Sequence, residues 1–198
     1  MKQVVLASAS ASRAAILEGA GVAFEVLGAG VDETAIKARL LATGAAPRVI
    51  AERLAAEKSR QASRMRPRAL VIGADQTLEL DGALVDKAAN VSEARARLTA
   101  LRGRTHRLHA AVAAAEDGEV VWRQVESPAL TARDFSDAFL DRYLARAGES
   151  VLASVGCYFL EGEGAQLFER IEGDYFAVLG LPLLPLLAML RDRGALSQ

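Results

Sequence analysis

The segment ALVIGAD, residues 69–75, constrains the fold of this chain more than any other stretch. Its β-branched and aliphatic residues predict a strand, and we expect that strand to end at the carboxylate of Asp75. The following residues, TLELDGALV, have the pattern of a β-hairpin that turns at Asp81-Gly82. The chain is therefore expected to contain a sheet with antiparallel pairing.

Apolar runs and helical patterns alternate along the rest of the chain. Further strands are predicted at residues 2–7, 105–115 and 119–126, and near 157–160 and 165–171. Helices are predicted from residue 12 or 13 to 19, from 47 to about 64, from a Ser92 cap to about 101, over 136–145 and after Pro182. This interleaving predicts an α/β protein with a mixed sheet, and its 198 residues suit one domain over residues 1–198.

The charge balance excludes several classes of partner. Lys and Arg number 24 against 25 Asp and Glu, which leaves a net charge of −1 and no field that collects nucleic acid. The single cysteine excludes a disulfide framework and a Cys-rich zinc site. The apolar runs are too short for a signal peptide or a membrane span. We expect a cytoplasmic enzyme or binding domain that contacts neither nucleic acid nor a membrane.

The first candidate site is LASASASR, residues 6–13, at the junction between a predicted strand and a predicted helix. Such a turn leaves backbone N–H groups free for an anion, Ser8 and Ser10 add hydroxyl donors, and Arg13 can grip phosphate oxygens in a bidentate fork. The alternative is that Ser8, Ser10 or Ser12 only caps the helix.

The second candidate pairs Asp75, at the expected strand end, with Lys87, which follows the hairpin. A carboxylate and an ammonium fit water activation and phosphate neutralisation, and the alternative is an ordinary turn carboxylate with a solvated lysine. The third is the adjacent pair Asp32 and Glu33, in the glycine-rich segment GAGVDETA, which can hold Mg²⁺ or simply be solvated. Lys58 lies on the apolar stripe of a predicted helix, so it either points into a pocket or extends to solvent from the helix end.

The tail holds the remaining chemistry-bearing residues. Its segment SVGCYFLEGEG carries Glu161 among several glycines, which imply tight backbone geometry or close approach to a ligand. His106 and His109 have no acidic neighbours in the sequence and are interpreted as ordinary sheet residues.

Taken in order, these motifs resemble the Maf family. The resemblance rests on LASASASR, GVDE, AAEK, GADQT, a lysine after the hairpin and GDYFAVLGLPL, and it covers residues 3 to about 193. It implies a fold similar to the inosine-triphosphate pyrophosphatases, with a long mixed sheet flanked by helices and a cleft between lobes. It also implies hydrolysis of a nucleoside triphosphate to the monophosphate and pyrophosphate, a divalent cation (Mg²⁺ or Mn²⁺), and a homodimer.

The resemblance assigns roles residue by residue. Asp75 matches the proton acceptor, and Lys58 and Lys87 match the two catalytic lysines. The metal-binding positions match Glu33 and Asp75, and the substrate-binding loop matches Ser8, Ser10, Ser12 and Arg13. Lys87 stands in DKA where the family usually has GKP, so the local turn is expected to differ.

The resemblance also bears on the base. Gln76 and Glu161 look more like the branch that cleaves 7-methyl-GTP than the branch that cleaves dTTP and UTP, and a carboxylate at 161 can accept hydrogen bonds from N1 and N2 of guanine. Ser12 stands where the 7-methyl-GTP branch has tryptophan, and Ser154 where the dTTP/UTP branch has lysine. Two other functions stay open: a nucleotide-sensing binding module in septum control, and a transferase that forms a sugar nucleotide.

Overall fold

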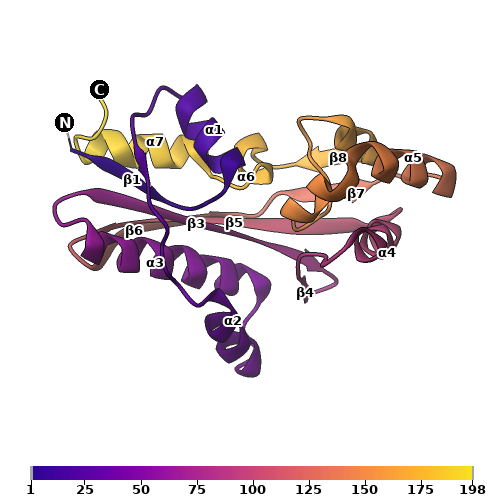
Figure 1. The fold of residues 1–198 in the computed structure, drawn as a ribbon, viewed down its shortest axis with the longest axis horizontal. Helices are drawn as coiled ribbons and strands as arrows, with labels where there is room; N and C mark the ends of the chain where they lie inside the picture. The colour runs from indigo at the N-terminus through magenta and orange to yellow at the C-terminus, as the bar shows by residue number, and fades with distance from the viewer. Residues whose placement is uncertain (1, 198) are drawn as a thin grey trace.

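The structure is a computed structural model that describes residues 2–197. Over these residues it has one eight-stranded sheet in the order β2-β1-β3-β5-β7-β8, with β4 paired to β3 and β6 paired to β5 (Figure 1). The strands are β1 (Val4–Ala7), β2 (Glu25–Val26), β3 (Leu70–Leu80), β4 (Ala83–Val85), β5 (Thr105–Glu116), β6 (Glu119–Glu126), β7 (Ala129–Ala132) and β8 (Phe168–Glu172). The predicted mixed α/β class is confirmed, because β1 pairs in parallel with β2 and β3 while the other pairings are antiparallel.

Helices cover both faces of this sheet. They are α1 (Ala11–Gly19), α2 (Glu33–Ala42), α3 (Pro47–Met65), α4 (Val91–Leu101), α5 (Asp137–Ala147), α6 (Tyr175–Val178) and α7 (Leu183–Asp192), with 3₁₀ turns η1 (Gly148–Ala153) and η2 (Glu163–Leu167). Across residues 2–197, none of the helices combines the length and apolar character needed to cross a bilayer.

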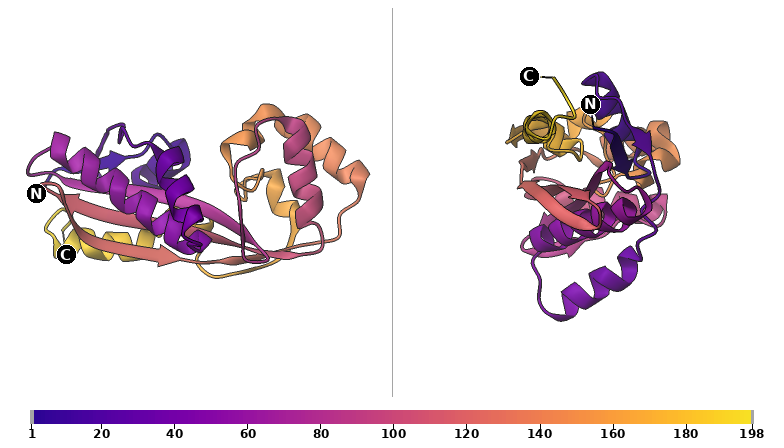
Figure 2. Two further views of the ribbon diagram at one scale, coloured as in Figure 1. Left: turned by 90° about the horizontal axis from the view of Figure 1, so that it is seen from below. Right: turned by 90° about the vertical axis from the view of Figure 1, so that its left-hand side faces the viewer.

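Two long strands join two lobes. β3 and β5 pair from Val71–Ala115 to Glu79–Arg107, and both run the length of the molecule (Figures 1 and 2). The first lobe has α3 on one face of the sheet and α1 and α7 on the other, and the second lobe holds α4, α5, β7 and β8 (Figure 1). Each lobe has its own apolar core. The first is built around residues such as Leu6, Ile72 and Leu186, and the second around residues such as Leu98, Leu130 and Leu140.

Helix α3 packs unusually close to β3. A Cβ added at Gly73 would lie 2.3 Å from the Ala55 carbonyl oxygen and 2.4 Å from the Ser59 nitrogen, so only glycine fits there. The contact surface of α3 is otherwise built from small residues such as Ala51 and Ala55, which are fully buried. The start of the helix is fixed as well, because Thr77 donates from Oγ1 to the Pro47 carbonyl at 2.9 Å. The part of α3 around Ser59 is therefore held directly over the middle of β3.

Most of the predicted elements are confirmed, but several boundaries differ. β3 does not end at Asp75; it continues to Leu80 because β5 pairs with it along its whole length. Helix α4 is capped by Asn90, which accepts from the Glu93 nitrogen, and not by Ser92. The hairpin turn is confirmed at Asp81-Gly82, where φ is 51° and 79°, as a type I′ turn requires.

The predicted strand near residues 157–160 is wrong. That segment is irregular and lies between η1 and η2, and the strand expected at 165–171 begins only at Phe168. Helix α2 was not predicted, because its apolar residues are only partly covered and give a weak periodic pattern; none of its residues is buried.

Gly73→Ala is expected to lower the free energy of unfolding by about 3 kcal/mol, since the new methyl group overlaps backbone atoms of α3 that cannot rotate away. Urea denaturation measures this change. The matched control is Gly19→Ala at the end of α1, where an added Cβ meets no atom within 4 Å and should leave stability almost unchanged. Equal stability of the two variants would contradict the close packing described here.

The two histidines of β5 predict acid sensitivity. His106 is buried, accepts or donates a 2.7 Å hydrogen bond between Nε2 and the Tyr158 hydroxyl, and has its pKa lowered by burial to about 4. His109 has an acidic neighbour after all, with Nε2 3.0 Å from Glu79 Oε2, and burial lowers its pKa too.

Because the folded pKa of His106 lies below its unfolded value, its contribution to stability is intact above pH 6.5 and is lost as the pH falls towards 4. Between these limits wild type should lose about 3 kcal/mol more than His106→Gln, which keeps a hydrogen-bonding side chain but does not titrate. Urea denaturation at about pH 7 and about pH 4.5 measures the difference. Parallel losses in the two proteins would show that His106 does not titrate in this way.

Candidate active site

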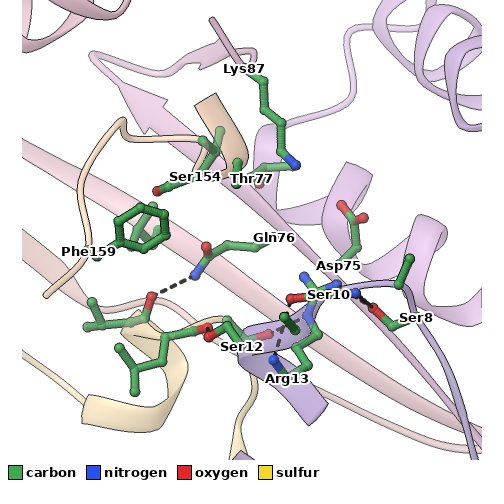
Figure 3. Close-up of a pocket in the computed structure, with 18 of the residues that line it drawn as sticks. Ser8, Ser10, Ser12, Arg13, Asp75, Gln76, Thr77, Lys87, Ser154 and Phe159 are labelled. Atoms are coloured by element: carbon green, nitrogen blue, oxygen red, sulfur yellow. Dashed lines mark hydrogen bonds between the residues drawn. The ribbon is translucent and has the colours of Figure 1, made fainter. Parts of the chain in front are cut away.

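A cavity of about 930 Å³ opens between the two lobes. One wall is formed by the β1–α1 turn, α2, α3 and β3, and the opposite wall by the segment after η1 (Figure 3). All ten residues singled out from the sequence line it: Ser8, Ser10, Ser12, Arg13, Glu33, Lys58, Asp75, Gln76, Lys87 and Glu161. The topology explains the convergence, since β1 ends opposite Gly73 and leaves the next part of β3 uncovered beside the α1 N-terminus.

The serines of the β1–α1 turn organise the turn itself. Ser10 caps α1 by accepting from the Arg13 nitrogen at 3.4 Å, and Ser8 Oγ accepts from the Ser10 nitrogen at 3.3 Å. Ser12 donates to the Leu179 carbonyl at 3.1 Å and so joins α1 to the segment after α6. The capping interpretation therefore holds for Ser10. Capping does not remove the residue from the cavity, because the same turn forms its wall.

Arg13 connects three segments. Its Nε donates to the Gly180 carbonyl at 2.9 Å, and its Nη1 donates to the Ala74 carbonyl at 3.0 Å and to Ser8 Oγ at 3.1 Å. Desolvation by burial lowers the pKa of Arg13, while the negative charges of Asp75 and Glu33 act in the opposite direction. Since Nε has one acceptor and Nη1 has two, an incoming anion would meet the Nη2 atom of Arg13.

The centre of the cavity is an alternating charge cluster. Lys58 is only 7% exposed, and its Nζ lies 2.6 Å from Asp75 Oδ1 and 2.9 Å from Glu33 Oε1. Lys58 can reach this point because it precedes Ser59, where α3 touches Gly73. Glu33 belongs to the first turn of α2 and not to a loop, while its neighbour Asp32 caps that helix by accepting from the Ala35 nitrogen.

The two carboxylates fit a magnesium or manganese ion that is shared with a phosphate. Glu33 and Asp75 both approach one point, where Lys58 now lies between them. In residues 2–197 no group of three or more His, Cys, Asp or Glu side chains forms a complete cage. Mg²⁺ usually takes one or two protein carboxylates and completes its shell with water and substrate phosphates, which this pair allows.

Lys87 enters the cavity from the segment after β4, and Figure 3 shows its side chain reaching inwards from the side opposite Arg13. Its neighbour Asp86 forms an ion pair with Lys37 of α2. Both members of this pair line the cavity, and sequence reasoning missed them. The only available signal was the DKA triplet, in which the aspartate replaces the glycine of the family pattern.

Gln76 is held by the backbone of α6. Its Nε2 donates to the Ala177 carbonyl at 3.0 Å and to the Val178 carbonyl at 3.1 Å, which fixes the direction of the amide oxygen (Figure 3). Glu161 lies across the cavity, on a wall that also carries Ser154 and Phe159. Gln76 therefore positions the segment after β8 as well as lining the cavity.

Comparisons with known proteins identify the family of this chain. The family model described as Maf-like protein matches residues 3–193. The chain is 60% identical over 194 residues to the nucleoside triphosphate pyrophosphatase of Caulobacter vibrioides, covering 98% of this chain and 97% of that protein. It is 52% identical to the nucleoside triphosphate pyrophosphatase of Maricaulis maris over the full length of both. It is 50% identical to the 7-methyl-GTP pyrophosphatase of Rhizobium meliloti, covering 98% of each.

Arg13→Lys tests the structural part of the Arg13 contacts. Lysine keeps the charge but cannot donate to the Gly180 and Ala74 carbonyls from a planar fork, so the free energy of unfolding should fall by about 2–4 kcal/mol. Thermal or urea denaturation measures the loss, with Arg39→Lys on the exposed side of α2 as the control. A stability equal to that of the control would mean that these bonds contribute nothing.

Proposed function

This chain belongs to the Maf family, and from that premise we propose that it is a nucleoside triphosphate pyrophosphatase. It hydrolyses a nucleoside triphosphate between the α and β phosphates and releases the monophosphate and pyrophosphate. The observation that carries the proposal is the cluster of Asp75, Lys58 and Glu33 in the cavity beside the α1 N-terminus. Such a cluster combines a proton acceptor, a buried cation and two metal-type ligands within reach of an anion-binding helix end.

The triphosphate is bound by the charged wall of the cavity. The β1–α1 turn, through Ser8 and Ser10, and the Nη2 atom of Arg13 face one side of the phosphate chain, and Lys87 faces the other. Each charge-assisted hydrogen bond contributes about 1.5–3 kcal/mol. The net charge of the protein is only −1, so these local cations must supply the attraction.

Glu33 and Asp75 are the residues that would hold Mg²⁺ or Mn²⁺. When bound, a divalent cation there neutralises phosphate charge and lowers the pKa of a bound water. Lys58, which lies 2.6 Å from Asp75 Oδ1 and 2.9 Å from Glu33 Oε1, holds both carboxylates in place and adds a positive charge beside the phosphates.

Asp75 accepts the proton of the attacking water. We assign this role to its Oδ2, because Oδ1 already accepts from Lys58 at 2.6 Å. The water oxygen forms a bond to the α-phosphorus, its proton passes to Asp75, and the bond from the α-phosphorus to the α–β bridging oxygen breaks. Pyrophosphate leaves with that electron pair, which Arg13 and the lysines stabilise.

The base is read by the wall opposite the phosphate loop. Glu161 can accept hydrogen bonds from N1 and N2 of guanine, which favours a guanine nucleotide such as 7-methyl-GTP. The relatives named for nucleoside triphosphates are 60% and 52% identical and the relative named for 7-methyl-GTP is 50% identical, so the preference for 7-methyl-GTP is a prediction of the site chemistry. The cytoplasmic location and the homodimer also stay predictions, and size-exclusion chromatography checks the second.

Pyrophosphate release from GTP, 7-methyl-GTP, UTP, dTTP and CTP, with Mg²⁺ and then Mn²⁺, tests the proposed activity. Asp75→Asn should reduce kcat by about 10²–10⁴-fold, because the amide can no longer accept the proton. Asp134→Asn makes the same chemical change at an exposed position outside the cavity, and it should match wild type.

Other outcomes identify the competing functions. Tight nucleotide binding without pyrophosphate release by folded wild type would favour a sensing module. A new sugar–phosphate bond in the products would favour a transferase. An Asp75→Asn variant with most of its activity would remove the assigned role of Asp75.

A further inference from the structure

The wall of the cavity opposite the phosphate loop is a single irregular segment, residues 154–161, which we call the 154–161 wall. It contributes six lining residues: Ser154, Val155, Tyr158, Phe159, Leu160 and Glu161. Apolar side chains with a few polar groups are what a planar base requires, whereas the opposite wall carries the phosphate-binding charges. The two ends of a nucleotide therefore meet different lobes of the protein.

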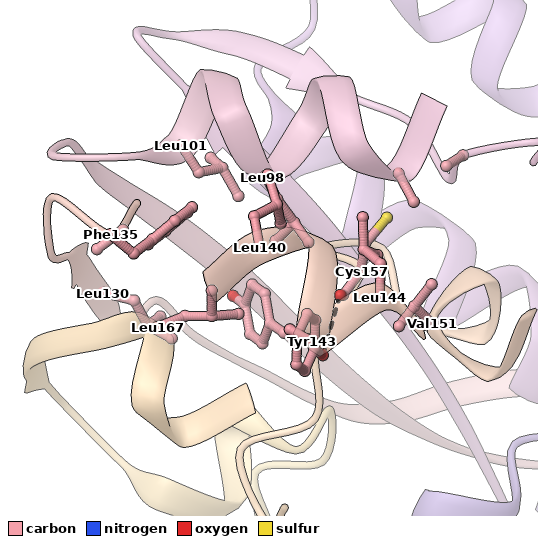
Figure 4. Packing of buried hydrophobic residues seen from close by; sticks show 14 of the residues in the cluster. Leu98, Leu101, Leu130, Phe135, Leu140, Tyr143, Leu144, Val151, Cys157 and Leu167 are labelled. Carbon is pink, nitrogen blue, oxygen red and sulfur yellow. Dashed lines mark hydrogen bonds between the residues drawn. The ribbon is translucent and has the colours of Figure 1, made fainter. Parts of the chain in front are cut away.

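Irregular segments are usually mobile, but three side chains fix the backbone and one ring of this wall. Arg97 of α4 donates from Nη1 to the Val155 carbonyl at 3.1 Å. Tyr143 of α5 donates to the Cys157 carbonyl at 3.2 Å, as Figure 4 shows. His106 of β5 binds the Tyr158 hydroxyl through Nε2 at 2.7 Å. Burial raises the pKa of Tyr143 to about 12, so its hydroxyl stays protonated and remains a donor at neutral pH.

The backbone of the wall needs such support because its conformation is strained. Cys157 has a φ of 60°, in the left-handed region that a residue with a Cβ rarely adopts. Gly156 lies against the Tyr158 ring so closely that an added Cβ would be 2.2 Å from a ring carbon. Strained conformations of this kind persist only where the surroundings over-determine them. The hydrogen bonds from Tyr143 and Arg97 lie on either side of the strained residues.

Neither Tyr143 nor Arg97 is among the residues that line the cavity. Tyr143 belongs to the core of the second lobe, where it packs with Leu140, Leu144 and Val151 (Figure 4). Any influence on substrate must therefore act through the wall that they hold. The phosphate-binding residues belong to the first lobe, to β3 and, in the case of Lys87, to the segment after β4. In residues 2–197 they share no hydrogen bond with Tyr143 or Arg97.

We infer that Tyr143 and Arg97 are positioning residues that set base selectivity by holding the 154–161 wall rigid. The inference rests on the proposed function and adds the source of its discrimination. A hydrogen-bonding site rejects the wrong base only if its groups cannot move to suit that base. A more mobile wall should therefore raise kcat/KM for the disfavoured bases relative to the preferred base. Binding of the phosphates should stay unchanged.

Tyr143→Phe removes one hydroxyl from this system and leaves the packing of the ring. The matched control is Tyr175→Phe, at an exposed position of α6 outside the cavity. The readout is the ratio of kcat/KM between the best base and the others, over GTP, 7-methyl-GTP, UTP, dTTP and CTP. Loss of one hydrogen bond should reduce that ratio by about fivefold in Tyr143→Phe and leave it unchanged in the control.

Inorganic tripolyphosphate serves as a probe without a base. Its inhibition constant should be the same in wild type and Tyr143→Phe, because the phosphate end is untouched. A change in this constant together with the ratio would indicate general damage to the fold and would overturn the inference. Thermal unfolding of each variant confirms that folded protein is compared.

Arg97→Lys provides a second, independent variant. It should also reduce the ratio, and the double variant should lose less than the product of the two single effects, because both residues hold one wall. If wild type discriminates between bases and both variants keep its ratio within about twofold, only the inference fails. If folded wild type releases no pyrophosphate from any triphosphate, the proposed function fails with it.

Discussion

The contact between α3 and Gly73 is the constraint on which the site depends. It brings a helix backbone against a strand with no side chain between them, and it places the next residue towards the N-terminus, Lys58, over Asp75. A buried ammonium is costly unless it is paired, and here Asp75 and Glu33 supply the pairing. Glu33 belongs to α2, which has no buried residue, so this charge cluster also helps to hold α2 at the cavity.

Much of the framework could be predicted from the sequence, because strong local signals specify it. The hairpin at Asp81-Gly82 needs two residues with positive φ, and α3 starts at Pro47, where a proline suits the first turn. Segments that depend on distant partners could not be predicted. β7 exists because Leu130 and its neighbours pair with β5 and β8, and residues 157–160 stay irregular because side chains of α4, α5 and β5 hold them.

The residues of the site were identifiable by type and order, but their contacts were not. Asp75 was placed at a strand end, whereas it lies within β3 just beyond the point where β1 stops. Arg13 was expected to offer a complete fork, whereas Nε binds the Gly180 carbonyl 167 residues away. The Lys37–Asp86 ion pair joins residues 49 positions apart. No local pattern in the sequence encodes such separations, since they follow from how the lobes are assembled.

The unbroken path of β3 and β5 through both lobes limits how this protein can move. A hinge between the lobes would have to bend a ladder of nine paired positions, from Val71–Ala115 to Glu79–Arg107, and would cost several hydrogen bonds at once. The two lobes therefore keep a fixed separation, which is set when the sheet folds. Under the proposed function, new side chains on the second lobe would change the nucleobase preference without moving the catalytic residues of the first lobe.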